Sequence, residues 1–388
     1  MRLIRWMFAG LVFAGLALGC SREEPQASDA LQLKVMTFGI AREGGRTDLR
    51  QVAAAIRAAG ADVVGLQRAK DSDLRIAALL GWDYVDERAN IISRFPLFPA
   101  THDGVAITYV EVARGQVVAV ANAQLPHDPY GPYAVRDGAT AEEVLQIEAD
   151  TRMPALAPMA AALPKLAGEK VPAFLIGDFG APSHLDWTKA ASKTDRAIRY
   201  PLEWPASKLL AEAGFTDSYR AVHPNPVTKP GITWTSGYPH AARADGETFD
   251  RIDFIYAIGP AKPVDSKVVG EDAKLADLAV DRWPSDRRAV VSTFEIEPAP
   301  TPDLAIVEPS RVALGDEFRV RVTMQKHDGY SVAIFSAESA SAPAITAQPL
   351  GDGGLEAVFG TARLKPGRYV AAIIDAAGKQ TAKTEFSV

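Results

Sequence analysis

Five short apolar runs, rich in β-branched and aromatic residues, constrain the fold of this chain more than any other feature. They are "LQLKVMTFGI" (31–40), "ADVVGLQ" (61–67), "VPAFLIGD" (171–178), "DRIDFIYAI" (250–258) and "RRAVVSTFEI" (287–296). Short, largely apolar runs of this kind are typical of strands that are buried on both faces. We therefore expect a core of buried strands that other elements cover on both sides.

Segments with other periodicities lie between these runs. Helices are expected at 47–59, 74–80, 140–166 and 206–214, and a hairpin at 105–125 that turns near Arg114 and Gly115. In the longest helical segment, Thr140 and Glu143 form a capping box. Pro154 and Pro158 are expected to kink or interrupt this helix. Strands mixed with helices in this order predict an α/β fold with two sheets rather than a simple parallel βαβ series.

The last quarter of the chain has a different pattern. Residues 298–303, "PAPTPD", are expected to form a stiff linker. Residues 304–388 contain only short strand-like runs and turns, which indicates a small all-β, immunoglobulin-like sandwich. The chain has 388 residues and is 47% hydrophobic, which is enough for two domains with separate cores. We expect these domains at 31–297 and 304–388.

The first thirty residues are typical of an exported protein. Arg2 and Arg5 precede an apolar stretch that ends at Cys20, the only cysteine. "LALGC" resembles a bacterial lipobox, so we expect a signal peptide at 1–19, lipidation of Cys20 and a polar tether at 20–30. The alternative is an ordinary exported cysteine. The prediction places the protein in the cell envelope, anchored by lipid on the periplasmic side, in the outer membrane rather than the inner one.

The overall charge argues against one class of partner. The net charge is −6 and the pI is about 5.6. Binding of long nucleic acid needs clustered Lys and Arg to neutralise phosphates, so we do not expect it. A small phosphate ester remains compatible with this charge.

Three aspartates stand at ends of the expected strands. Asp178 closes "FLIGD", Asp253 lies within "RIDFIY", and Asp286 precedes "RRAVVSTF". Each has an ordinary interpretation: Asp178 as an Asx turn, Asp253 as an ion-pair partner of Arg251 or of a neighbour, and Asp286 as a turn residue. Carboxylates at buried edges are costly unless they are paired or functional, so three together suggest a common site.

Seven blocks of sequence together resemble the endonuclease/exonuclease/phosphatase superfamily. They are "LKVMTFGI", "ADVVGLQ", "NIISRFPL", "VANAQL", "FLIGDFGAPSHLDW", "RIDFIYA" and "WPSDRRAVVSTF", and they cover residues 31–297 in the family's order. The resemblance implies a four-layered α/β sandwich of two mixed sheets flanked by helices. It also implies hydrolysis of phosphate esters with Mg²⁺ or Mn²⁺.

The resemblance is broken at the positions that carry the family's chemistry. It implies an Asn at Gly39, a metal-binding Glu at Arg68, a His at Gln124, an Asn at Gly180 and a closing His at Arg287. The candidate catalytic residues are therefore Asp178, Asp253, Asp286 and Arg287, with Asp286 as the residue left to hold a metal. Gly39, Arg68, Gln124 and Gly180 are altered positions of the candidate binding site. Two arginines and two lost oxygen ligands make tight Mg²⁺ binding unfavourable.

Three functions are compatible with this pattern. The first is a pseudoenzyme without a cofactor, which binds a small anionic or phosphate-containing ligand or a protein; here Arg68 is expected to pair with Asp178 or Asp286. The second is a phosphoric ester hydrolase with weak or altered use of Mg²⁺ or Mn²⁺, in which His127 replaces the missing imidazole. For His127 we favour a surface loop position. The third is an envelope interaction protein that binds its partner through residues 304–388.

Overall fold

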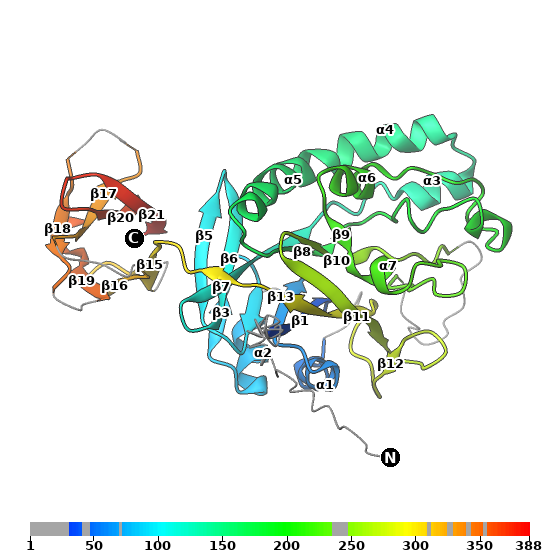
Figure 1. Ribbon diagram of the computed structural model, residues 1–388, viewed down its shortest axis with the longest axis horizontal. Coiled ribbons are helices and arrows are strands. Elements are labelled where there is room, and N and C mark those ends of the chain that lie inside the picture. The colour runs from blue at the N-terminus through cyan, green and yellow to red at the C-terminus, as the bar shows by residue number, and fades with distance from the viewer. Residues whose placement is uncertain are drawn as a thin grey trace, which may run out of the picture. The chain divides into compact units, whose positions relative to one another are not determined.

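The computed structural model describes residues 31–40, 47–69, 72–234, 247–308, 312–323, 329–338, 343–351 and 355–388 (Figure 1). The predicted signal peptide, Cys20 and tether lie outside the described residues.

The first sheet contains the expected strands at 31–40, 61–67 and 287–296. Its strand order is β12-β11-β13-β1-β2-β4-β3. The strands are β1 (Leu31–Gly39), β2 (Val63–Gln67), β3 (Tyr84–Asp86), β4 (Ile91–Ser93), β11 (Ala261–Gly270), β12 (Leu278–Ala279) and β13 (Ala289–Ile296). Strand β1 runs parallel to β2 and antiparallel to β13, so the sheet is mixed.

The second sheet contains the predicted hairpin and the remaining two apolar runs. Its order is β5-β6-β7-β8-β10-β9, and β14 pairs with β7. The strands are β5 (Leu97–His102), β6 (Val105–Ala113), β7 (Gln116–Gln124), β8 (Ala173–Asp178), β9 (Thr216–Asp217), β10 (Asp253–Ile258) and β14 (Ala299–Pro300). Strand β7 runs parallel to β8, and β8 antiparallel to β10, so this sheet is also mixed.

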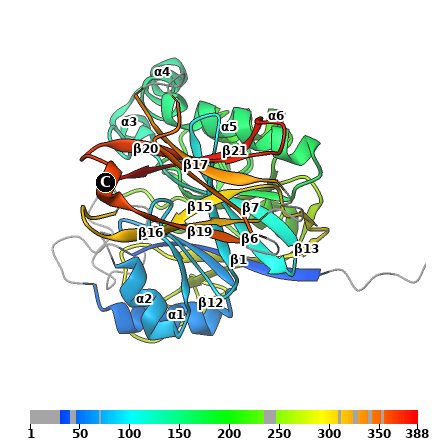
Figure 2. The same ribbon diagram turned by 90° about the vertical axis from the view of Figure 1, so that its left-hand side faces the viewer.

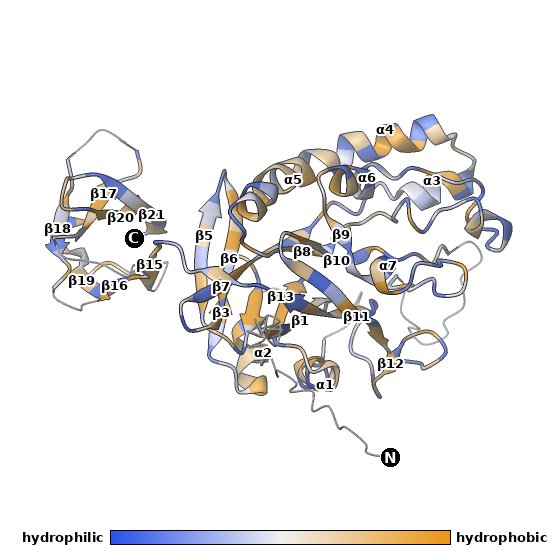
Figure 3. Cartoon of the chain, viewed as in Figure 1, coloured by the Kyte–Doolittle hydropathy of each residue, from blue (hydrophilic) through white to orange (hydrophobic). Residues whose placement is uncertain are grey.

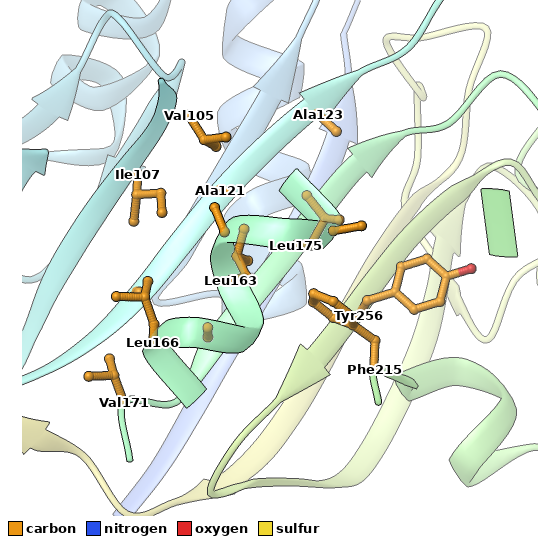
Figure 4. Close-up of a cluster of buried hydrophobic side chains, with 14 of the residues drawn as sticks. Val105, Ile107, Ala121, Ala123, Leu163, Leu166, Val171, Leu175, Phe215 and Tyr256 are labelled. Carbon is orange, nitrogen blue, oxygen red and sulfur yellow. The ribbon is translucent and has the colours of Figure 1, made fainter. Parts of the chain in front are cut away.

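Helices lie on the outer sides of the two sheets (Figure 2), and one short helix, Ser218–Val222, packs against strands of both sheets. They are α1 (Leu49–Ala59), α2 (Asp73–Leu80), α3 (Gly131–Asp137), α4 (Ala141–Thr151), α5 (Met153–Gly168), α6 (Pro205–Glu212) and α7 (Ser218–Val222). Side chains of α1 and α2 share a core with the first sheet. Side chains of α5 and α6 share one with the second sheet, where Leu163 and Leu166 face the strands (Figure 4).

A third core lies between the two sheets. It joins Val35 and Val63 of the first sheet to Phe174, Ile176 and Ile255 of the second. Strands β8 and β13 are therefore buried on both sides, which explains their apolar sequences, and Figure 3 colours much of the central strands as hydrophobic. The predicted α/β class with two mixed sheets is confirmed.

The long helical segment begins as predicted but is divided. Thr140 and Glu143 form the capping box at the start of α4. The chain breaks at Arg152, between α4 and α5, and Pro154 occupies the first turn of α5, where a missing N–H is tolerated. Pro158 lies inside α5, so the expected interruption occurs only before Pro154.

The expected linker at 298–303 is partly wrong. Ala299 and Pro300 form β14, in which Ala299 pairs with Val117 and Pro300 with Gln116 of β7. Ala299 is buried in the core beneath the second sheet. A proline is tolerated here because β14 is a sheet edge, where an N–H is not required.

The C-terminal residues form two further sheets. One has the order β15-β16-β19 and the other β18-β17-β20-β21. The strands are β15 (Ala305–Glu308), β16 (Glu317–Val322), β17 (Ser331–Ser336), β18 (Thr346–Pro349), β19 (Glu356–Gly360), β20 (Arg368–Ile374) and β21 (Gln380–Ser387). Val320, Ile334 and Ala371 share one core, so the two sheets pack on each other. The expected all-β character of this region is confirmed.

Within the described residues, no helix combines the length and the apolar character needed to cross a membrane.

Candidate functional site

Strand register brings the predicted site positions together at one end of the central strands of both sheets; we call this end the site edge. Gly39 at the end of β1 is the register partner of Gln67, directly before Arg68. In the other sheet, Asp178 at the end of β8 has Gln124 and Asp253 as its two register partners. Because β10 and β13 run in the opposite direction, their first residues meet the last residues of the parallel strands. Segments that are more than 200 residues apart in sequence, as Gly39 and Arg287 are, therefore share this edge.

At the centre of this site edge, an arginine lies between two aspartates. Arg287 Nη2 lies 3.0 Å from Asp178 Oδ2, and Arg287 Nη1 lies 3.5 Å from Asp253 Oδ2. All three side chains are almost fully buried, at 0–1% exposure. We call this group the Arg287 bridge. The backbone N–H of Gly180 also donates to Asp178 Oδ1 at 3.0 Å, so both oxygens of that carboxylate have partners.

The charges of the Arg287 bridge are coupled. Burial raises the pKa of Asp253, Arg287 opposes this shift, and the Asp178 carboxylate adds to it, so that the pKa lies at about 7. Burial lowers the pKa of Arg287, but Asp178, Asp253 and Asp286 outweigh that effect and raise it. The guanidinium therefore stays charged, and its ion pair with Asp178 is shorter than its ion pair with Asp253.

Two glycines give other groups room to enter the site. A Cβ atom on Gly39 would lie 2.9 Å from Cδ of Arg287. A Cβ atom on Gly180 would lie 2.6 Å from the carbonyl oxygen of Pro126. These are the two positions at which the resemblance implies an Asn. The space that such side chains would need is taken by Arg287 and by the backbone of Pro126.

Aromatic rings cover Arg287. The Trp234 ring lies 4.8 Å from the guanidinium carbon, a cation–π geometry. The His127 ring lies 5.4 Å from Trp234 and stacks on Tyr130 at 5.2 Å. Tyr130 donates to Asp250 at 2.8 Å.

The surface loop position favoured for His127 is wrong. Its ring is packed between Tyr130 and Trp234, and Nε2 is buried without a hydrogen-bond partner among the described residues. Burial lowers the pKa of His127 to about 4, with a further contribution from Arg287. The loop around it is exposed at Pro126, Asp128 and Pro129, so the ring rather than the loop is packed inside.

A second buried arginine fixes the loop that carries His127. Arg152 donates to the carbonyl oxygens of Gly180, His127 and Pro129 at 2.9, 2.7 and 2.8 Å. Its Nη1 also lies 3.1 Å from Glu148 Oε1. The sequence analysis missed Arg152, because its position within a helical pattern carries no local signal of these contacts.

Arg68 and Gln124 contact each other rather than the aspartates. Gln124 Oε1 accepts the Arg68 backbone N–H at 3.0 Å, and Arg68 has a left-handed backbone with φ 57°. In the part of the chain that the structure describes, no ion pair joins Arg68 to Asp178 or Asp286. The expected pairing is therefore replaced by Arg287, whose side chain enters from the start of β13.

The ordinary interpretations of the three aspartates, as turn residues or ion-pair partners, have different outcomes in the structure. Arg251 pairs with Asp186 and Asp217 at 2.9 and 2.7 Å rather than with Asp253, whose ion-pair partner is Arg287 at 3.5 Å. Asp178 makes the expected turn contact with Gly180 but also belongs to the Arg287 bridge. Asp286 is buried and directly precedes Arg287 in the sequence. Its charge contributes to the raised pKa of Arg287.

The described side chains offer a divalent cation few ligands. Among the described residues, no three His, Cys, Asp or Glu side chains come together in a way that suits a metal ion. Asp178 and Asp253 approach each other, but the guanidinium lies between them. Chemically, this arrangement pairs the two carboxylates with a cation of the protein itself, while Asp253 Oδ1 is buried without a hydrogen-bond partner among the described residues.

Comparison with known proteins identifies relatives of the chain. Residues 38–287 match the model of the "Endonuclease/Exonuclease/phosphatase family". An uncharacterised protein of Caenorhabditis elegans, F14F9.5, is 32% identical over 307 residues, which are 72% of this chain and 96% of that protein.

Three solved structures are similar at lower identity. An endonuclease/exonuclease/phosphatase from Beutenbergia cavernae is 20% identical with a TM-score of 0.42, over 92% of this chain and all of that one. The 3' phosphatase NExo from Neisseria, bound to a product DNA hairpin, is 20% identical with a TM-score of 0.43, over 68% and 99%. Truncated Caenorhabditis elegans TDP2 is 19% identical with a TM-score of 0.42, over 68% and 97%.

Proposed function

The chain belongs to the endonuclease/exonuclease/phosphatase family, and we propose that it is a member that has lost metal-dependent ester hydrolysis and serves as a binding protein of the cell envelope. The family is usually metal-dependent, so the first question is whether the residues of this chain suit Mg²⁺ or Mn²⁺. They do not, because the Arg287 bridge occupies two of the three retained carboxylates, Asp178 and Asp253, and leaves only Asp286 outside it. This single observation carries the proposal.

The energetics support the same conclusion. A divalent cation would have to displace a buried guanidinium that is paired with two carboxylates and covered by Trp234. Breaking a buried ion pair by removing one partner costs about 3–5 kcal/mol. Mg²⁺ also requires near-octahedral oxygen ligands, whereas Gly39 and Arg68 supply no side-chain oxygen.

The proposal includes the parts of the chain outside the catalytic fold. A signal peptide at 1–19 and lipidation at Cys20 would hold the protein at the periplasmic side of a membrane, preferably the outer one. Residues 304–388 would form a separate immunoglobulin-like domain that binds a protein partner. The ligand of the family fold would be a small anion or phosphate ester, which Arg68 at the site edge would contact.

Calorimetric titration of the purified protein with Mg²⁺ and Mn²⁺ tests the proposed loss. We expect no binding in the micromolar range and no turnover of bis-p-nitrophenyl phosphate above that of an Asp178→Ala control. One micromolar site together with Asp178-dependent turnover would refute the proposal.

A second function has one specific observation in its favour. His127 lies inside the site, with a neutral ring near Asp178 and Arg287, rather than on the surface. It would supply the imidazole of a phosphoric ester hydrolase, in which arginines stabilise the transferred phosphoryl group. Metal-independent turnover that falls to background in His127→Ala, but survives in a His102→Ala control, would favour this function over the first.

A further inference from the structure

Two separate parts of the chain enter the site at the two glycines that replace the family's asparagines. Arg287 extends over Gly39, and the Pro126 carbonyl lies over Gly180. The two intrusions come from different elements, since Arg287 precedes β13 and Pro126 follows β7. Each glycine is buried, so the space that it leaves open lies inside the fold.

Arg287 cannot easily yield to a side chain at position 39. Its guanidinium is held by Asp178 and Asp253, and the Trp234 ring covers it. Its backbone is also held, because its N–H donates to Ser285 Oγ, and Ser285 Oγ donates to the Gly39 carbonyl oxygen. Cδ of Arg287 is thus the middle of a side chain that is fixed at both ends.

The Pro126 carbonyl is equally constrained. The carbonyl oxygen of the next residue, His127, accepts a hydrogen bond from Arg152. Arg152 also donates to the carbonyl oxygen of Gly180. One buried guanidinium therefore holds both sides of the close approach. The backbone of Gly180 has φ +60°, a conformation that asparagine tolerates better than most residues, so the obstacle to an Asn is the carbonyl oxygen rather than the backbone angle.

We infer that the site is filled by the protein itself, with Arg287 as its resident cation, and that Gly39 with Arg287 and Gly180 with the Pro126 carbonyl are mutually dependent pairs. The inference rests on the proposed loss of hydrolysis, because it states how that loss is built into the packing. Restoring the family residues singly then destabilises the fold instead of rebuilding a catalytic site. The close approaches of Arg287 to Gly39 and of the Pro126 carbonyl to Gly180 are expected in solution as long as Arg287 stays paired with the two aspartates.

Gly39 allows a clean steric test. Its backbone does not lie in the left-handed region, so an alanine there causes no backbone strain. Replacing a glycine within a strand by alanine normally raises stability. We expect Gly39→Ala to lower the melting temperature of the full-length protein. In an Arg287→Ala background the same substitution should leave the melting temperature unchanged or raise it.

Controls make the result specific. Gly360→Ala changes a strand glycine that has nothing within 4 Å of a new Cβ, and it should not lower the melting temperature. If Arg287→Ala does not fold, the background becomes Arg287→Ala with Asp178→Asn and Asp253→Asn, which leaves neither carboxylate of the Arg287 bridge without its counter-ion. Equal losses from Gly39→Ala in both backgrounds, or no loss in either, would overturn the inference for this pair.

The second pair is tested in the same way. Gly180→Asn should lower the melting temperature, whereas Gly104→Asn, at another glycine with positive φ and nothing within 4 Å, should be tolerated. Equal tolerance at both positions would overturn the inference for Gly180. Melting temperatures do not depend on turnover, so hydrolysis by the natural protein would refute the proposed function and leave this inference to be judged separately.

Discussion

At the scale of single residues, the site is governed by what buried charges require. Arg287 and Arg152 are both fully buried, and each is held by carboxylates and other fixed groups. A buried guanidinium without partners is prohibitively costly, so each arginine dictates the positions of the groups around it. Arg287 orders the retained aspartates, and Arg152 orders the loop that carries His127.

Glu148 provides a test of these buried charges away from the aspartates. Burial raises the pKa of Glu148 to about 7, and Arg152 opposes the shift only in part. The folded protein keeps a proton that the unfolded chain releases above its ordinary pKa, so stability is lost as the pH rises from about 4.5 to 7. From the size of the shift, this loss is about 3 kcal/mol as an upper bound.

Replacing Glu148 by Gln should therefore flatten the fall in unfolding free energy between pH 4.5 and 7. Denaturant unfolding of both proteins across this range measures the difference. Asp250, whose pKa burial raises to about 6, acts in the same direction in both proteins, and His127 acts in the opposite one. An unchanged slope in Glu148→Gln would mean that Glu148 is ionised in the folded state at neutral pH.

At the scale of elements, the parallel pair β7 and β8 determines where the site lies. Their ends bring Gln124 beside Asp178, and Gly177 allows the two strands to approach closely. A Cβ atom on Gly177 would lie 1.9 Å from the carbonyl oxygen of Ala123, and its φ of +144° is one that side chains disfavour. The strand end that presents Asp178 thus requires glycine at this position.

We expect Gly177→Ala to destabilise the protein by about 4 kcal/mol or more, through steric overlap and backbone strain. Gly115→Ala is the matched control. It changes a positive-φ glycine in the β6–β7 hairpin with nothing within 4 Å, and it should cost only about 1 kcal/mol. Urea unfolding compares the two variants, and similar losses would show that the close approach of β8 to β7 is unimportant.

At the scale of the whole molecule, the described residues contain several separate cores. Those of the two large sheets draw on residues before position 307, whereas the core of the C-terminal sheets draws on residues 305–388. A region with its own core of alternating inward side chains, such as Phe318 and Val320 of β16, has what independent folding requires.

The separate core leads to a prediction about the C-terminal region. A fragment of residues 304–388 should fold alone, with a β-type circular dichroism spectrum and a cooperative thermal transition. Val320→Asp, which places a charge in the centre of that core, should abolish the transition. A natural fragment without any cooperative transition would argue that residues 304–388 are not a domain.

The local sequence by itself determined the strands, the capping box at Thr140 and the positions of Asp178 and Asp253, because periodicity and neighbouring residues carry that information. Only the tertiary structure decided that Arg287 rather than Arg68 pairs with the aspartates, and that His127 turns inward. The physical reason is that Arg287 and Asp178, like His127 and Trp234, are more than 100 residues apart in sequence, so the partner of a buried group depends on which side chain the packing brings within reach.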